Sequence, residues 1–259
     1  MAELEMGDAA SKVKSGMFPS EKQLLSKLSQ VIRRRIDRLG ASSLLRAPLP
    51  RPVIYIDLGL HRTAVQIQLV REWFGHLRNL TIYGFEANPD YHADAEALFS
   101  GDSRVKIINA AVVGPDHTSE RVTLNIGGKL NGLGDSLFKK HDRHTSAIEV
   151  AAIRLSEFMR REGIDRSDAA VIIRMNIEGA ELHVLRDLNQ AGLISRIDGW
   201  YGLWNDCSKI DPVLGHELEK LKSTASIENV SFNDRDSRGK YARLKEALIR
   251  YDIETMIGS

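Results

Sequence analysis

The chain has 259 residues and a formal net charge of +1; 42% of the residues are hydrophobic and 27% are charged. This balance is typical of a globular protein with its own core, and the near-neutral charge gives no reason to expect a nucleic-acid partner. The single cysteine, Cys207, excludes an internal disulfide and lacks the neighbours of a zinc site. No apolar run is long enough for a membrane span or a secretion signal, so we expect a cytoplasmic protein.

A basic segment comes first. Between Lys12 and Arg51 the chain has ten Lys or Arg residues and two acids. Apolar residues at helical spacing predict an amphipathic helix over residues 21–39, within an N-terminal extension of residues 1–50. The apolar face of this helix packs on the rest of the chain, or the helix contacts an anionic membrane surface or an acidic protein partner. The sequence leaves these alternatives open.

Residues 51–259 form one predicted domain in which short apolar runs alternate with helical patterns. Such runs are typical of parallel strands that are buried on both faces, with helices on the two sides of the sheet. The predicted fold is therefore α/β, with a doubly wound, mostly parallel, Rossmann-like sheet. In chain order, we predict a strand at 53–56, a helix at 63–74, a strand at 80–85, a helix at 89–99, strands at 105–108, 121–126, 147–152 and 169–175, a helix at 180–188, a strand at 197–203, a helix at 213–221, a strand at 227–232 and a charged helical tail from 241.

A glycine-rich loop separates the fourth and fifth predicted strands. Four of the eight residues from 127 to 134 are glycine, which favours mobility. Ser136 follows this loop and is a candidate contact to a substrate. Trp204 follows the seventh predicted strand and is a candidate wall of an acceptor pocket, although core packing explains it equally well.

Two acids and a glycine lie at the ends of the first two predicted strands. Asp57 and Gly59 end the first strand, and Glu86 ends the second. Ligands of such sheets bind outside the carboxyl ends of the strands. A carboxylate there can accept hydrogen bonds from both hydroxyls of a ribose, and a glycine lets the backbone approach a ligand. Asp57 either holds the loop or reaches the amino group of a methionine. Helix capping explains a lone acid, but the combination favours an adenosyl ligand.

A nicotinamide dinucleotide also uses an acid after the second strand, but it needs a G-x-G-x-x-G turn after the first strand to hold its diphosphate. Here Gly59 is followed by Leu60, His61 and Arg62. The bulky side chains of His61 and Arg62 obstruct a diphosphate, so the sequence disfavours this cofactor.

Five segments resemble FkbM-type methyltransferases in order and spacing: VIYIDLG, IYGFEANP, VKIINAAV, IEVAAIRLSEFM and VIIRMNIEGAELHVLRDL. The resemblance covers roughly residues 51–204. It implies a methyltransferase domain, S-adenosyl-L-methionine as the cofactor, and a hydroxyl group of a small-molecule or saccharide acceptor as the target. It also implies which residues contact the methionyl, ribosyl and adenine parts of the cofactor. These are, in turn, Asp57 and Gly59; Phe85, Glu86 and Ala87; and Asn109 and Ala110.

The chain departs from the family pattern at two places. The first loop of the family usually reads D-x-G-A-N-x-G, and residues 60–63 differ from it. His61 and Arg62 are therefore further candidates for cofactor binding, and Arg62 would compensate by pairing with the cofactor carboxylate. Asn176 stands where the family typically has Asp. A neutral amide can orient a hydroxyl group but cannot take its proton.

The base that removes the proton of an acceptor hydroxyl is then Glu178, Glu181 or a histidine. Glu178 is the first candidate because it lies where a strand becomes a helix at the mouth of the predicted site, although helix capping also explains it. Glu181 lies one turn later, where packing is the alternative. The predicted catalytic residues are Glu178, Asn176 and Glu181, and no metal site is predicted.

A second function stays open from the sequence. Thr63 and Asn176 depart from the family pattern, and such departures are also expected in a relative that has lost its catalytic activity. Such a protein would act as a binding or scaffold protein through its basic N-terminal helix.

Overall fold

The structure is a computed structural model that describes residues 51–75, 79–127, 134–139 and 144–230. The predicted N-terminal helix and the charged tail from Tyr241 lie outside these residues. Within the described ranges, no helix has both the length and the apolar character that a membrane crossing requires. What the structure describes is the α/β part of the chain.

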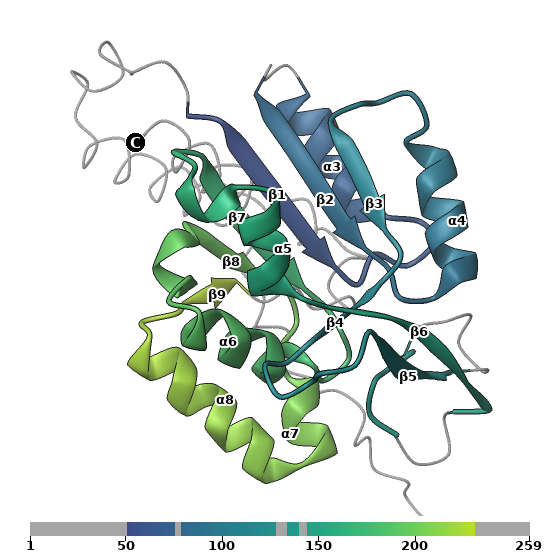
Figure 1. The fold of residues 1–259 in the computed structure, drawn as a ribbon, viewed down its shortest axis with the longest axis vertical. Coiled ribbons are helices and arrows are strands. Elements are labelled where there is room, and N and C mark those ends of the chain that lie inside the picture. Colours follow the sequence, from purple (N-terminus) through teal and green to yellow (C-terminus); the bar gives the residue numbers. More distant parts are fainter. Residues whose placement is uncertain (1–50, 76–78, 128–133, 140–143, 231–259) are drawn as a thin grey trace, which may run out of the picture. The chain divides into compact units, whose positions relative to one another are not determined.

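A six-stranded parallel sheet forms the centre of this part (Figure 1), with the strand order β3-β2-β1-β7-β8-β9. Its strands are β1 (Val53–Leu58), β2 (Leu80–Phe85), β3 (Val105–Ile108), β7 (Ala170–Met175), β8 (Gly199–Tyr201) and β9 (Asn229–Val230). The chain adds strands outward from β1 on one side and then returns to add β7 on the other. The strand order therefore reverses between β1 and β7, which favours a binding crevice at their carboxyl ends.

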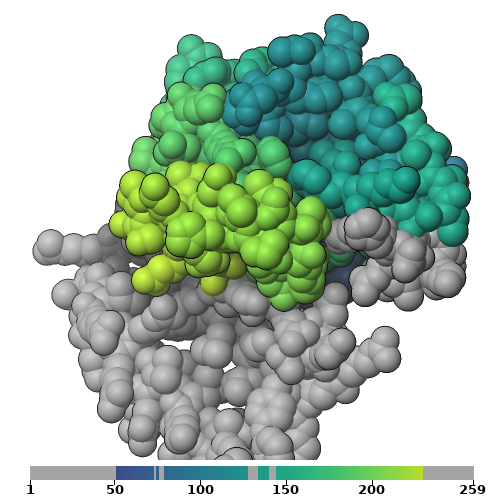
Figure 2. All heavy atoms as spheres, turned by 90° about the horizontal axis from the view of Figure 1, so that it is seen from below, coloured from purple at the N-terminus to yellow at the C-terminus, as the bar shows by residue number. Residues whose placement is uncertain are grey.

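Helices cover both faces of the central sheet. The described α-helices are α3 (Val65–Phe74), α4 (Pro89–Leu98), α5 (Leu155–Arg161), α6 (Glu181–Gln190), α7 (Asp206–Ile210) and α8 (Pro212–Thr224). Successive side chains of a strand point to opposite faces, so Ile56 and Leu58 of β1 pack with α5, α6 and α8, whereas Val53 and Tyr55 pack with α3 and α4. Figure 2 views the molecule from below, where the yellow-green surface of α7 and α8 borders the teal surface of the middle of the chain.

A separate three-stranded sheet lies beyond the arrowheads of β1 and β2 in Figure 1. It consists of β4 (Ala111–Val113), β5 (Arg121–Ile126) and β6 (Ser146–Arg154), in the order β4-β6-β5. Strand β6 pairs in parallel with β4 and in antiparallel with β5. The sequence predicted β5 and β6 but not β4, because only two residues separate β4 from the end of β3.

The predicted α/β class with a mostly parallel central sheet is confirmed. Most predicted elements agree with the structure to within a few residues, and β5 has the bounds predicted for it. The short helices α5 and α7 were not predicted. Helix α5 follows β6 without a loop, and α7 has only five residues, so neither leaves a helical period in the sequence.

Candidate functional site

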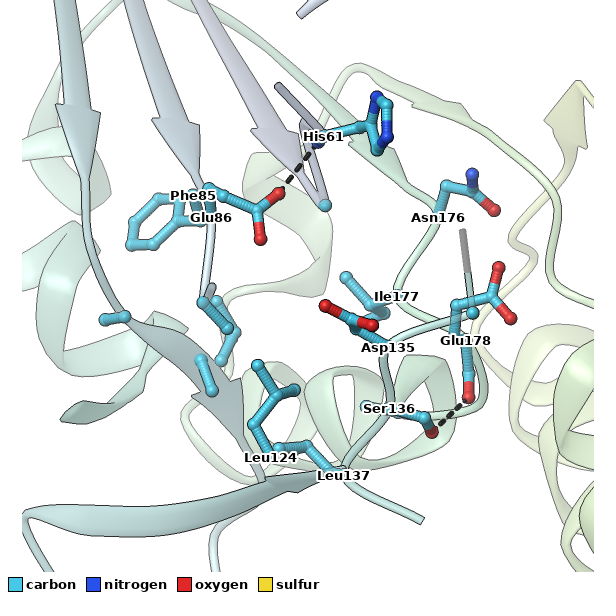
Figure 3. A pocket seen from close by; sticks show the side chains of 17 residues that line it. His61, Phe85, Glu86, Leu124, Asp135, Ser136, Leu137, Asn176, Ile177 and Glu178 are labelled. Carbon is cyan, nitrogen blue, oxygen red and sulfur yellow. Dashed lines mark hydrogen bonds between the residues drawn. The ribbon is translucent and has the colours of Figure 1, made fainter. Parts of the chain in front are cut away.

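A pocket lies at the carboxyl ends of β1, β2 and β7 and is bordered by the small sheet (Figure 3). Its empty volume, including the part open to solvent, is about 710 Å³. Its apolar wall consists of Phe85, Ala87, Ala110, Ala111, Val112, Leu124, Leu137, Ile177 and Ala180. Its polar side chains are His61, Glu86, Asp135, Ser136, Asn176 and Glu178. One pocket thus combines an apolar surface with several fixed polar groups.

Glu86 lies on the pocket wall directly after β2, with 8% of its surface exposed. The backbone N–H of His61 donates to its Oε2 at 2.7 Å, and the backbone N–H of Asn88 donates to its Oε1 at 2.9 Å. Burial raises the pKa of Glu86, and these two hydrogen bonds oppose the rise. A carboxylate has about four lone-pair sites, so one held by two amides can still accept hydrogen bonds from a ligand.

The loop after β1 supplies one of these amides through an unusual backbone path. Gly59 has a φ of 85°, His61 of 60°, and Ala64, at the start of α3, of 40°. A Cβ atom at Gly59 would lie 2.2 Å from the backbone oxygen of Asn176. Glycine therefore lets this loop pass close to the segment after β7. Its predicted role of admitting a ligand stays a prediction, because this close contact is to the chain itself.

Asp57 lies beneath this loop, and the pocket wall does not include it. It is fully buried, and Arg174 Nη1 donates to its Oδ1 at 2.6 Å and to the Gly59 carbonyl oxygen at 3.2 Å. The two side chains belong to paired positions of β1 and β7. Burial raises the pKa of Asp57, and the charge of Arg174 opposes this rise. Of the two predicted roles of Asp57, the contacts match the one in which it holds the loop.

Arg62 and Asn109 also lie off the pocket wall. Arg62 pairs with Asp94 at 3.6 Å, and its guanidinium lies 4.4 Å from the ring centre of Tyr91. Asn109 Nδ2 donates to the backbone oxygen of Glu86 at 2.9 Å. Arg62 thus does not obstruct the pocket, and Asn109 supports the turn that carries Glu86.

The segment after β7 brings Asn176 and Glu178 to the pocket (Figure 3). Glu178 has a φ of 56° and precedes α6, whose N-cap is Ala180. The Ser136 hydroxyl donates to the carbonyl oxygen of Glu178 at 2.8 Å and fixes this turn. Asn176 Oδ1 is buried and accepts no hydrogen bond within the described residues. Buried polar atoms rarely lack a hydrogen-bond partner, and a ligand that donates a hydrogen bond would supply one for Asn176 Oδ1.

Glu181 and Trp204 lie behind the pocket rather than on its wall. Glu181 is fully buried, and its Oε1 accepts the backbone N–H of Ile177 at 3.2 Å. Burial raises the pKa of Glu181 to about 7. Trp204 is buried and donates its Nε1–H to the carbonyl oxygen of Tyr201 at 3.1 Å. Glu181 therefore supports the segment that carries Glu178, and Trp204 belongs to the core.

Asp135 is the polar pocket residue that the sequence analysis missed. Its Oδ1 accepts the backbone N–H of Gly127 at 2.8 Å, and its Oδ2 accepts the side-chain N–H of Asn88 at 2.9 Å. In Figure 3 its carboxylate points into the pocket. Its position between the glycine-rich loop and Ser136 was the available signal. In the described part of the chain, no group of three His, Cys, Asp or Glu side chains is arranged to hold a metal ion.

Fold and pocket together define a class of protein: an α/β protein with a Rossmann-like sheet and a pocket at the reversal of its strand order, where such proteins bind nucleotide-containing cofactors. A family model described as the methyltransferase FkbM domain matches residues 57–229, well over half of the chain. The chain therefore belongs to the FkbM methyltransferase domain family, which confirms the resemblance found in the sequence. No curated protein matches the chain.

Proposed function

We propose that this protein is an S-adenosyl-L-methionine-dependent methyltransferase that acts on a hydroxyl group of a small-molecule or saccharide acceptor. One observation carries the proposal: Glu86 presents a carboxylate, fixed by two backbone amides, to a pocket at the carboxyl end of β2. Two hydroxyls on adjacent carbons of a ribose match the two oxygens of such a carboxylate. The family match supports methyl transfer as the reaction class.

The pocket residues fit the parts of this cofactor. Glu86 would hold the ribose, and the apolar residues Phe85, Ala87 and Ala110 would contact the adenine. His61, Gly59 and Asn176 lie at the polar end, where the buried Asn176 Oδ1 would accept a hydrogen bond from the methionyl ammonium or from the acceptor hydroxyl. When bound, the cofactor supplies a methyl group activated by its positively charged sulfur.

Residues of the protein would carry out the other steps of the reaction. An acceptor alcohol must be aligned with the methyl group and must lose its proton. Alignment supplies much of the rate enhancement of such reactions, and a positioned base typically adds about 10²–10⁴-fold. Glu178 is the proposed base because it lies on the pocket wall next to Asn176, which orients the hydroxyl. Ser136 holds the Glu178 backbone in place.

The decisive experiment is calorimetric titration with S-adenosylhomocysteine, followed by incubation with methyl-labelled cofactor and fractionated cell extract. Glu86→Ala should weaken binding by at least about 100-fold, because two charge-assisted hydrogen bonds of about 1.5–3 kcal/mol each are lost. Glu96→Ala is the matched control, since Glu96 is exposed on α4. Glu178→Gln should bind the ligand but not transfer the label.

Failure of the wild-type protein to bind S-adenosylhomocysteine near millimolar concentration would overturn the proposal. That result would favour the alternative of a catalytically degenerate binding or scaffold protein. The cytoplasmic location and the membrane or protein contact of the basic helix stay predictions.

A further inference from the structure

The charged side chains among the described residues that line the pocket all have the same sign. Among the described residues that line it, the carboxyl side chains are Glu86, Asp135 and Glu178, and there is no lysine or arginine. The described ion pairs include neither Glu86 nor Asp135. A pocket of this kind favours a positively charged ligand.

Asp135 is held so that its charge stays in the pocket. Among the described residues, both of its hydrogen-bond donors, the Gly127 amide and the Asn88 side chain, are neutral, so neither compensates its charge. Asn88 also donates its backbone N–H to Glu86, so one residue ties the two carboxylates together. Burial is the main cause of the raised pKa of Glu86, and the nearby negative charge of Asp135 adds to it, as expected for two carboxylates that repel each other. A cation between them would relieve this repulsion.

We propose that Asp135, together with Glu86, makes the pocket prefer the sulfonium form of the cofactor over its demethylated product. This inference rests on the proposed function. S-adenosylmethionine and S-adenosylhomocysteine share their adenosine, ammonium and carboxylate groups, and they differ by a methyl group and one positive charge. Methyl transfer removes that charge, so the attraction to Asp135 weakens when the reaction is complete. Asp135 is then a specificity-determining residue that favours exchange of the product for fresh cofactor.

The test is calorimetric titration of the full chain with each of the two ligands, without an acceptor. The wild-type protein should bind S-adenosylmethionine about tenfold more tightly than S-adenosylhomocysteine. Asp135→Asn should bring this ratio close to one, mainly by weakening binding of the charged ligand. Asp168→Asn is the control. Asp168 is exposed and lies just before β7, at the amino ends of the strands, whereas the pocket lies at their carboxyl ends. It should leave both affinities within about twofold of wild type.

A second measurement does not depend on how well the Asp135 variant folds. Raising the salt concentration should reduce the wild-type affinity ratio, because ions screen attraction between charges. Sinefungin, which carries an ammonium group near the position of the sulfonium, should behave like S-adenosylmethionine.

Three results would overturn the inference: a wild-type ratio near one, a ratio unaffected by salt, or a folded Asp135→Asn protein that weakens both ligands equally. If neither ligand binds to the wild-type protein, the proposed function itself fails.

Discussion

The pocket has two sides that are held in different ways. Its sheet side consists of the segments that follow β1, β2 and β7: 59–61, 86–87 and 176–178. Backbone hydrogen bonds connect these segments to neighbouring strands, since the Gly59 N–H donates to the carbonyl oxygen of Phe85 at 3.0 Å and the Asn176 N–H donates to that of Leu58 at 3.0 Å; side chains such as Arg174 and Asn109 add to them. The backbone hydrogen bonds depend little on side chains, except where a glycine is required.

The hairpin side consists of Leu124 of β5 and residues 134–137. One pair of backbone hydrogen bonds, between Asn125 and Ser136, connects these residues. The remaining described connections of its polar residues use side chains, namely those of Ser136, Asp135, Asn88 and Asn125. The comparison teaches that backbone contacts position the sheet side of the pocket, whereas single side chains hold the opposite wall in place.

The largest expected effect concerns the glycine of the sheet side. Gly59→Ala should lower the free energy of unfolding by roughly 3 kcal/mol or more, because the new Cβ would meet the Asn176 oxygen at 2.2 Å and the φ of 85° strains alanine. Urea denaturation followed by tryptophan fluorescence measures this loss.

Gly101→Ala separates the two causes. Gly101 has a φ of 92°, but no atom lies within 4 Å of the Cβ that would be added. This variant should lose only about 1 kcal/mol, the cost of backbone strain. Equal losses in the two variants would show that the close approach of the loop after β1 to the segment after β7 is unimportant.

An intermediate effect concerns the buried acid behind the sheet side. The unfolded chain loses the Glu181 proton near pH 4.5, and the folded chain keeps it to about pH 7. Between these values the folded state binds more protons, so the contribution of Glu181 to stability falls as pH rises. The loss should be on the order of 1–3 kcal/mol.

Glu181→Gln removes this dependence but keeps an oxygen that can accept the Ile177 N–H. Urea denaturation at several pH values should show that wild type loses stability relative to this variant between about pH 5 and pH 8, because only wild type must bury a charge. A difference between the two proteins that is constant over this range would contradict the burial of an ionisable Glu181.

The smallest effect concerns the hairpin side. Ser136 is 1% exposed; its hydroxyl donates to the Glu178 carbonyl oxygen and accepts the N–H of Phe138 at 3.1 Å. Ser136→Ala leaves both groups without this partner and should cost about 1 kcal/mol. Thermal and urea denaturation measure it, with Ser100→Ala as the control, because the Ser100 hydroxyl donates to the Ala97 oxygen at an exposed site. A cost no larger than that of the control would remove Ser136 as a support of the Glu178 turn.

The sheet side was largely predictable from the sequence. Buried parallel strands appear as continuous apolar runs, and the rule that ligands bind at the carboxyl ends of strands led directly to Gly59, Glu86, Asn176 and Glu178. The rule did not choose between the two predicted roles of Asp57, because the sequence does not show that Arg174 lies opposite it on a strand 117 residues away.

The hairpin side was predicted only through Ser136. Its other residues depend on how the small sheet packs against the large one, and this arrangement leaves no periodic pattern in the sequence. Leu124 and Leu137 look like ordinary core residues, and Asp135 looks like a loop acid. The packing of the two sheets brings all three to one cavity.

The bond from Arg174 to both Asp57 and the Gly59 carbonyl has a consequence for the order of assembly. During synthesis, the turn that presents the His61 amide to Glu86 emerges more than a hundred residues before its guanidinium anchor. A truncated chain that stops before β7 has the strand, the turn and Glu86, but it leaves the Asp57 charge without its counterion. The turn after β1 therefore gains this anchor only when β7 joins the growing sheet.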